Sequence, residues 1–153
     1  RRPAFGRAKP TYGMNAKVSM EKKLKHLEFI QQAINRMASN LFLLKGWTVT
    51  LIAAMFALAA KESRDLYFLL AYFPALMFWL LDGYFLSQER RFRSLYDYVT
   101  KLDESAIDFS MDTQPFKATP ARNKWSYALF SPTLLIYYGV LVAAMSVVWF
   151  LLR

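Results

Sequence analysis

The sequence predicts an all-α membrane protein: a long antiparallel helical hairpin that extends into the cytoplasm, plus a third C-terminal transmembrane helix. Three observations predict this class. The chain is 56% hydrophobic, and its charges collect in residues 1–40, 61–65 and 87–124. Three apolar blocks of about 20 residues, the length that spans a hydrocarbon core, account for most of the rest. Outside the blocks, apolar residues recur every three or four positions, as they do on one face of a helix.

The apolar blocks are the predicted transmembrane helices. The first, residues 41–60, contains one charge at Lys45, and the second, residues 66–86, contains one charge at Asp82. The third, residues 132–152, contains none. Buried helices of a soluble bundle are the alternative, but a soluble helix normally keeps a polar face. The blocks therefore favour a membrane protein.

Residues 1–18, which open with "RRPAFGRAKPTYG", lack periodicity and predict a basic extended arm. Ser19 is expected to begin a helix, because serine caps the first turn and Glu21 favours the helix dipole. A hairpin is predicted over residues 19–104. Its first helix carries an apolar stripe into the first block. This stripe consists of Met20, Leu24, Leu27, Ile30, Ile34, Met37 and Leu41.

The second helix of the hairpin continues past its block with a matching stripe, which predicts a two-helix stalk. Residues 105–125, with two prolines and small polar residues, are predicted as a cytoplasmic linker that Phe109 and Phe116 attach to the stalk. Residues 126–153 are predicted as an interfacial segment and the C-terminal transmembrane helix, which begins at Ser131 and Pro132. The matching stripe consists of Phe85, Phe92, Leu95, Tyr96, Val99 and Leu102.

Basic residues predict the orientation. Residues 1–40 contain nine Lys/Arg against two acidic residues, and residues 87–125 contain seven Lys/Arg. The positive-inside rule places both regions in the cytoplasm. Three spans then leave the N-terminus in the cytoplasm and the C-terminus outside.

Lys45 and Asp82 lie at matching positions in their blocks, near the cytoplasmic end of each, so an antiparallel hairpin places them at one depth. A charge in the bilayer is costly unless it is paired or reaches the interface. We predict an intramembrane ion pair that sets the hairpin register, with Gly46 and Gly83 allowing close helix contact. The alternatives are a pore-lining role between subunits and snorkelling without pairing.

Small residues in the blocks indicate helix packing. Ala53 and Ala57 share one side of the first block, and Gly139 and Ala143 share one side of the third. Small residues spaced in this way let helices approach closely, within or between chains. With the apolar stalk, they predict a homo-oligomer or a subunit of a larger membrane complex.

Basic residues beside the membrane predict contact with the anionic headgroups of the lipid bilayer. A nucleic acid or nucleotide partner is the less specific alternative, because the arm mixes aromatic and basic residues. The predicted contact residues are Arg1, Arg2, Arg7, Lys9, Arg90, Arg91 and Arg93.

The sequence carries no catalytic or cofactor-binding pattern, such as a glycine-rich phosphate loop. It has no cysteine, and His26 is its only histidine, which we expect to be solvated because a metal site requires further ligands. The acidic residues that follow the second helix lack the spacing of a Ca²⁺ loop and are expected to form a solvated turn. We predict no enzyme activity, no metal site and no cofactor. The acidic residues are Asp103, Glu104, Asp108 and Asp112.

The segments "KLKHLEFIQQAINRM", "FLLKGWTVTLIAAMFALAAK" and "LDGYFLSQERRFRSLYDYV" resemble small bacterial inner-membrane proteins over residues 20–100. In layout they are similar to multi-span effectors of bacterial anti-phage systems, in which helical hairpins assemble into membrane-disrupting oligomers. The resemblance implies an inner-membrane location and an oligomeric effector or channel-like pore, gated from its cytoplasmic stalk, in bacterial defence. The alternative is a non-catalytic structural or accessory subunit that docks into a larger membrane complex.

Overall fold

Helices make up most of the chain in a computed structural model that describes residues 12–62 and 65–152. The two long helices are α1 (Tyr12–Glu62) and α2 (Asp65–Lys101), followed by the short α3 (Trp125–Leu129) and by α4 (Pro132–Leu152). The described ranges contain no strand. Three helices, α1, α2 and α4, are long and apolar enough to span a membrane. The predicted all-α class with three such helices is therefore confirmed.

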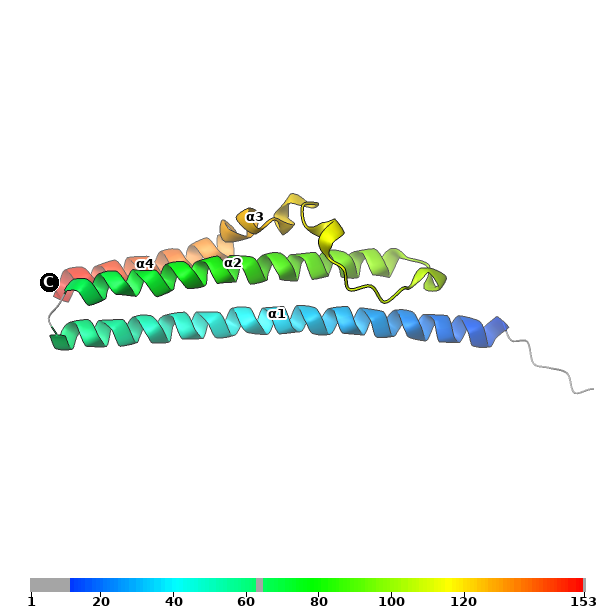
Figure 1. Ribbon diagram of the computed structural model, residues 1–153, viewed down its shortest axis with the longest axis horizontal. Coiled ribbons are helices and arrows are strands. Elements are labelled where there is room, and N and C mark those ends of the chain that lie inside the picture. The colour runs from blue at the N-terminus through cyan, green and yellow to red at the C-terminus, as the bar shows by residue number, and fades with distance from the viewer. Residues whose placement is uncertain (1–11, 63–64, 153) are drawn as a thin grey trace, which may run out of the picture.

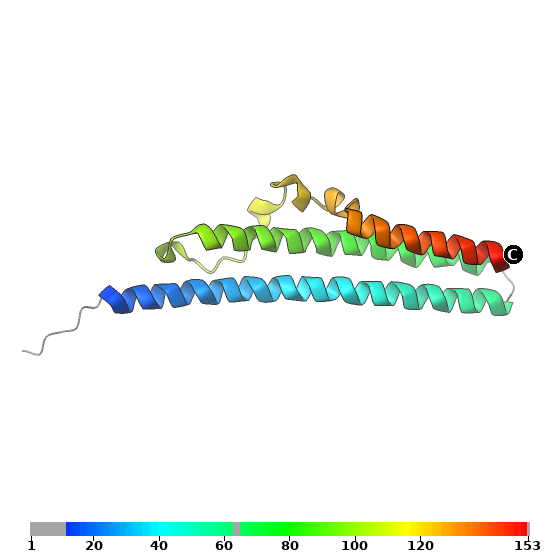
Figure 2. The same cartoon turned by 180° about the vertical axis from the view of Figure 1, so that it is seen from behind.

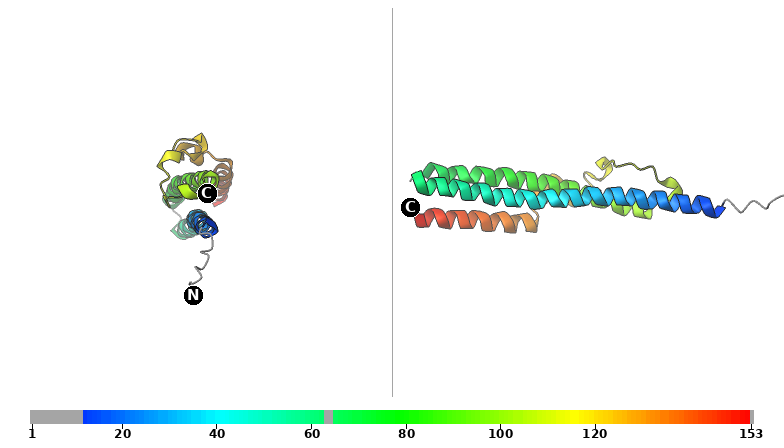
Figure 3. Two further views of the ribbon diagram at one scale, coloured as in Figure 1. Left: turned by 90° about the vertical axis from the view of Figure 1, so that its right-hand side faces the viewer. Right: turned by 90° about the horizontal axis from the view of Figure 1, so that it is seen from below.

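The molecule is a rod with two different halves (Figure 1). α1 and α2 lie side by side and antiparallel, and they share the largest set of contacts between elements. α4 runs along α2 in the half that contains the apolar segments (Figures 1 and 2). The other half, which we call the stalk, consists of residues 17–40 of α1 and 87–101 of α2, with the linker of residues 102–124 folded against it. Figure 3 shows that α4 lies beside the half opposite the stalk and does not extend along the stalk.

α1 begins earlier than predicted. Residues 12–18 are helical, so the expected extended arm and the helix start at Ser19 are wrong for this part of the chain. Beyond Pro10 no proline follows until α2, and Met14, Ala16 and Lys17 are good helix formers that extend the first turn. Residues 1–11 lie outside the described residues, so the predicted arm is not described there.

Each half of the hairpin has its own apolar core. In the stalk, Ile30 and Ile34 of α1 pack with Leu95 and Val99 of α2, as the two stripes predict. The other half contains the helical segments that are long and apolar enough to span a membrane, and we call it the membrane half. There, Ile52, Ala71, Ala75 and Met145 form a second cluster, to which α1, α2 and α4 all contribute. The N-terminal end of the first stripe is not packed in this core, because Met20 and Leu24 remain exposed.

The linker is more ordered than the predicted loop. α2 ends at Lys101, before the expected boundary at residue 104, and three short 3₁₀ turns follow. Phe116 packs against the stalk core, and the ring of Phe109 lies 5.4 Å from the ring of His26. Asn123 is fully buried between the linker and α2. The turns are Glu104–Ala106, Gln114–Phe116 and Ala121–Asn123.

α4 begins at Pro132, as the sequence predicts. Proline suits the first helical position because its missing N–H would have no partner there. The Ser131 carbonyl accepts the Leu135 N–H, which starts the helix. The Ser131 hydroxyl, however, is buried without a hydrogen-bond partner among the described residues, so this side chain does not cap the helix.

Candidate functional site

Lys45 and Asp82 form an ion pair between α1 and α2. Lys45 Nζ lies 2.9 Å from Asp82 Oδ2. The Asp82 side chain is 0% exposed, while that of Lys45 is 26% exposed. Lys45 Nζ also lies 3.4 Å from the Leu41 carbonyl oxygen, one turn earlier in α1. The structure therefore brings together the two charges that lie within the apolar segments of the hairpin.

Two tyrosines of α4 complete this site. The Tyr138 hydroxyl donates to Asp82 Oδ2 at 3.0 Å, and the Tyr137 hydroxyl donates to the Lys45 carbonyl oxygen at 3.0 Å. Lys45 Nζ also lies 5.5 Å from the centre of the Tyr137 ring, within cation–π range. Lys45, Asp82, Tyr137 and Tyr138, which we call the polar cluster, thus join α1, α2 and α4.

The polar cluster meets the physical requirement for a charge in an apolar setting. Burying an ion pair costs desolvation that only good geometry and further hydrogen bonds offset. Lys45 and Tyr138 both satisfy Asp82 Oδ2, while Asp82 Oδ1 is buried without a partner among the described residues. Removal of either partner would leave a charged group without a counterion in an apolar setting. The arrangement can hold three helices in one register, and it leaves one carboxylate oxygen available as a further acceptor.

Sequence reasoning missed both tyrosines. The signal was present, because "YY" is the most polar pair of an otherwise apolar block and lies near the same end of its helix as Lys45 and Asp82. The depth argument that paired the two charges would have placed Tyr138 beside them. Neither tyrosine carries a charge, so a search for charges within the apolar blocks does not find them.

The flanking glycines do not act as predicted. A Cβ at Gly46 would meet nothing within 4 Å, so no helix packs closely there. A Cβ at Gly83 would come within 2.8 Å of Leu129 Cγ and 3.3 Å of Leu129 Cα. Gly83 therefore admits α3, not α1. The predicted glycine contact across the hairpin is wrong, because the two long helices face each other through side chains at other positions.

The small residues assigned to helix packing lie on the outside of the chain. Ala53 and Ala57 of α1 and Gly139 and Ala143 of α4 are all exposed. A Cβ at Gly139 would meet nothing within 4 Å. These residues do not pack the three helices against one another, so any close packing they support involves another molecule.

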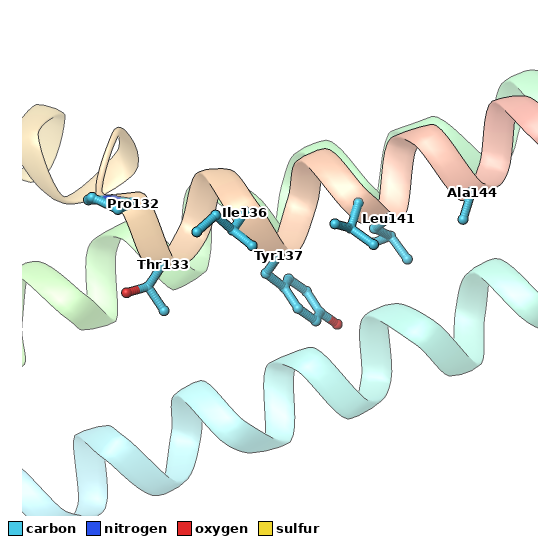
Figure 4. A pocket seen from close by; sticks show the side chains of 7 residues that line it. Pro132, Thr133, Ile136, Tyr137, Leu141 and Ala144 are labelled. Carbon is cyan, nitrogen blue, oxygen red and sulfur yellow. The ribbon is translucent and has the colours of Figure 1, made fainter.

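A groove of about 630 Å³ lies along α4, on the side that faces α1 (Figure 4). Tyr137 lines this groove, and its ring points toward α1 in Figure 4. α4 packs mainly on α2, which leaves this side open. The remaining lining residues are Pro132, Thr133, Ile136, Val140, Leu141 and Ala144.

The basic residues that follow the second apolar segment have distinct environments. Arg93 pairs with Glu89, with Nη2 2.7 Å from Glu89 Oε1, and Arg91 is buried with its Nε unpartnered among the described residues. Arg90 Nη1 donates to the Arg122 carbonyl oxygen at 2.8 Å. Desolvation by burial lowers the pKa of Arg90, and the charge of Arg122 lowers it further. Arg91 is therefore not accessible, whereas Arg93 is exposed and Arg90 is partly exposed, so lipid contact stays a prediction for these two residues.

The linker is held to α2 by side chains that bind backbone groups. The Ser87 hydroxyl donates to the Asn123 carbonyl at 2.7 Å, and Asn123 Nδ2 donates to the Ser94 hydroxyl at 2.9 Å and to the Phe116 carbonyl at 3.0 Å. Trp79 Nε1 donates to the Leu129 carbonyl at 3.1 Å. These bonds fix the path that leads the chain back to α4.

The end of the stalk holds His26, which is 1% exposed and not solvated as expected. Its Nε2 donates to the Ser110 carbonyl oxygen at 2.9 Å, and Nδ1 is buried without a partner among the described residues. Lys23 Nζ donates to the Thr100 and Leu102 carbonyls, at 2.9 and 2.7 Å, where α2 ends. The prediction for His26 is wrong because the linker folds back over it.

The predicted acidic turn is largely exposed, and two of its residues order the linker. Asp108 Oδ1 accepts the Ser110 N–H, and Asp112 Oδ1 accepts the Gln114 N–H. Among the residues that the structure describes, no group of three or more His, Cys, Asp or Glu side chains could hold a metal ion. Arg1, Arg2, Arg7 and Lys9 lie outside the described residues.

No protein-family model, no curated protein and no solved structure matches this chain.

Proposed function

We propose that this protein is an oligomeric integral membrane effector that acts as a channel-like pore and is gated from its stalk. The observation that carries the proposal is the continuity of the hairpin. α1 and α2 run without a break from the stalk into the apolar segments. A displacement of the stalk would therefore move the membrane helices. The polar cluster lies at the stalk-side end of those helices, so its contacts would change first.

The surface of the single chain supports an assembly of several copies. Exposed small residues on α1 and α4 would let helices of neighbouring copies approach closely. The stalk also exposes apolar side chains that the hairpin leaves uncovered. An ion path in this proposal runs between copies, with Lys45 as the partly exposed charge beside it. The uncovered stalk residues are Val18, Met20, Leu24 and Phe29.

The proposal includes the bacterial inner membrane, a cytoplasmic stalk and N-terminus, and an external C-terminus. The excess of basic residues around the stalk supports this orientation. A role in bacterial defence, without enzyme activity or a cofactor, follows from the resemblance in layout. A cysteine at residue 152, tested with a membrane-impermeant thiol reagent on intact cells, would check the orientation, because the native chain has no cysteine.

Reconstitution in liposomes would test the channel. Purified protein is expected to release an entrapped dye, and its expression is expected to collapse the membrane potential of bacterial cells. Asp82→Asn should assemble but conduct less, whereas Asp97→Asn, an exposed acid of the stalk, should behave as the parent. Unchanged potential and no dye release, at any protein density or under any trigger, would exclude the channel.

Cysteine cross-linking would test the assembly. Leu24→Cys introduces a single thiol on the exposed apolar part of the stalk, so a disulfide can form only between two copies. Lys22→Cys, an exposed position two residues away and on another side of α1, is the control. Cross-linking at Leu24 that exceeds cross-linking at Lys22 supports an oligomer joined through the stalk. Equal or absent cross-linking contradicts it.

The second candidate is a structural or accessory subunit of a larger membrane complex. The exposed apolar residues at the end of the stalk favour it, because a different chain could cover them as well as a second copy. Gentle solubilisation followed by mass measurement separates the two candidates. A particle with a second type of chain supports the accessory subunit, and a homo-oligomer argues against it.

A further inference from the structure

We propose that the pocket formed by Leu86, Glu89, Arg90, Arg93 and Arg122 binds the phosphate of an anionic phospholipid. The phosphate would bridge Arg90 of α2 and Arg122 of the linker. The inference rests on the membrane setting of the proposed function but not on channel activity. We call this site the arginine pocket; its volume is about 380 Å³.

The arginine pocket lies where lipid headgroups would be. Leu86 is the last residue of the second apolar segment, and Arg90 follows one helical turn later. Three aromatic residues near the linker end, Trp125, Tyr127 and Phe130, are exposed. Trp125 Nε1 also donates to the Leu80 carbonyl, which places its ring beside the end of that segment. Aromatic residues of this kind concentrate at membrane interfaces.

The charges of the arginine pocket are not balanced. Three guanidinium groups face one carboxylate, and that carboxylate is engaged by both Nε and Nη2 of Arg93. Within residues 12–62 and 65–152, neither Arg90 nor Arg122 belongs to an ion pair. Arg90 and Arg122 are close enough to repel each other, and the attraction of Arg90 to Glu89 is smaller than this repulsion. An anion between them would relieve this repulsion.

Phosphate is the anion that fits this arrangement. A guanidinium binds phosphate through two parallel N–H groups, and Arg90 uses only Nη1 for the Arg122 carbonyl. The side chain of Arg122 makes no hydrogen bond within the described residues, so its donors are available. Leu86, the one apolar residue of the lining, belongs to the apolar segment and lies one helical turn before Arg90, so it can contact the acyl chain of a lipid whose phosphate the arginines bind. A soluble anion would make no such contact.

A bound lipid would act on the fold as well as on affinity. Arg90 and Ser87 already hold the turn of residues 121–123, which begins the return to α4. A phosphate shared by Arg90 and Arg122 would add a second link between α2 and that turn. The lipid would thereby stabilise the position of α4 on the hairpin.

The test compares Arg122→Gln with Arg36→Gln. Within the described residues, Arg122 enters the hydrogen bonds of the fold only through its backbone carbonyl, so the glutamine variant should remain folded. Arg36 is exposed, and it lies as far along α1 from Lys45 as Arg91 lies along α2 from Asp82. Arg91 is the neighbour of Arg90 in the chain, so Arg36 is at about the depth of the arginine pocket. Both variants therefore remove one positive charge at a similar depth, but only one alters the pocket.

Each protein is placed in nanodiscs of phosphatidylcholine with or without phosphatidylglycerol, and retained lipid is counted by native mass spectrometry. Thermal unfolding is followed in parallel. Arg122→Gln should bind phosphatidylglycerol about tenfold more weakly, since it loses a charge-assisted contact, and should lose its lipid-dependent rise in Tm. Arg36→Gln should retain both. Arg90→Gln should match Arg122→Gln in lipid binding.

Two results would overturn the proposal. If Arg36→Gln loses as much phosphatidylglycerol binding as Arg122→Gln, only the general positive charge of the surface matters. An equal rise in Tm when inorganic phosphate is added to phosphatidylcholine nanodiscs would show that the pocket takes a soluble anion. Channel activity enters neither readout, so failure of the pore and failure of the lipid site remain distinguishable.

Discussion

The two halves of the rod bury polar groups in different ways. In the membrane half, the polar cluster satisfies its charges mainly with other side chains, as in the bonds from Lys45 and Tyr138 to Asp82. In the stalk half, side chains such as Asn123, Ser87 and Lys23 bind backbone carbonyls of the linker and of the end of α2. The difference has a physical cause. In a hydrocarbon setting no water is available and a helix satisfies most of its own backbone groups, so the two charges depend mainly on each other and on the Tyr138 hydroxyl, while the Tyr137 hydroxyl binds the Lys45 carbonyl.

The comparison implies different consequences of mutation. Loss of one of the two charges of the polar cluster leaves the other without its counterion in an apolar setting, and Asp82 is also the group that Tyr138 of α4 binds. Loss of a linker contact frees a local segment that water can solvate. The following substitutions test this distinction, from the largest expected effect to the smallest.

Asp82→Ala should have the largest effect, lowering the free energy of unfolding by about 4 kcal/mol because Lys45 loses its buried partner. Denaturation in detergent micelles, followed by circular dichroism, would measure it. The double variant Lys45→Ala/Asp82→Ala should recover part of the loss, because it removes both charges. The ion-pair interpretation fails if Asp82→Ala unfolds like the parent and the double variant is no more stable than Lys45→Ala.

Asn123→Ala should destabilise the linker by about 3 kcal/mol, because the Phe116 carbonyl loses its donor and a fully buried side chain is removed. Hydrogen exchange should accelerate across residues 105–125 and remain slow in the apolar segments. Asn35→Ala is the matched control, since Asn35 is exposed and bonds only to Gln31. Equally faster exchange in the membrane half would show that the two halves are not separable.

Gly83→Ala and Gly46→Ala should have opposite signs. Both replace a helical glycine with a better helix former. The Gly83 methyl group, however, would collide with Leu129, so this variant should lose about 2 kcal/mol as α3 shifts. Gly46→Ala should be neutral or stabilising by up to about 1 kcal/mol, because open space surrounds it. Equal effects in thermal unfolding would contradict the assignment of Gly83 to α3.

Tyr138→Phe should have the smallest effect, about 1 kcal/mol, because it removes one hydrogen bond to Asp82 and retains the ring. Tyr137→Phe is the comparison, since its hydroxyl binds a backbone carbonyl instead of the carboxylate. Thermal unfolding should rank Tyr138→Phe as the more damaging. The reverse ranking would mean that α4 is joined to the hairpin through Lys45 and not through Asp82.

Much of the architecture was predictable because it depends on local patterns. The lengths of the apolar blocks indicate three helices of membrane-spanning length, and a period of three to four residues indicates the stalk core of Ile30, Ile34, Leu95 and Val99. The matching depths of Lys45 and Asp82 follow from counting residues along two antiparallel helices. Orientation in a membrane, assembly and function stay predictions.

The sequence by itself determined which segments form the long helices and which two charges share a depth. Period and length can be counted along the chain without knowing how it folds. Only the tertiary structure decided that Tyr138 reaches Asp82, that Leu129 packs on Gly83, and that the linker buries His26 and Asn123. These contacts depend on the path that residues 102–131 take back along α2. That path is set by hydrogen bonds to backbone carbonyls, which every residue possesses and which therefore leave no pattern in the sequence.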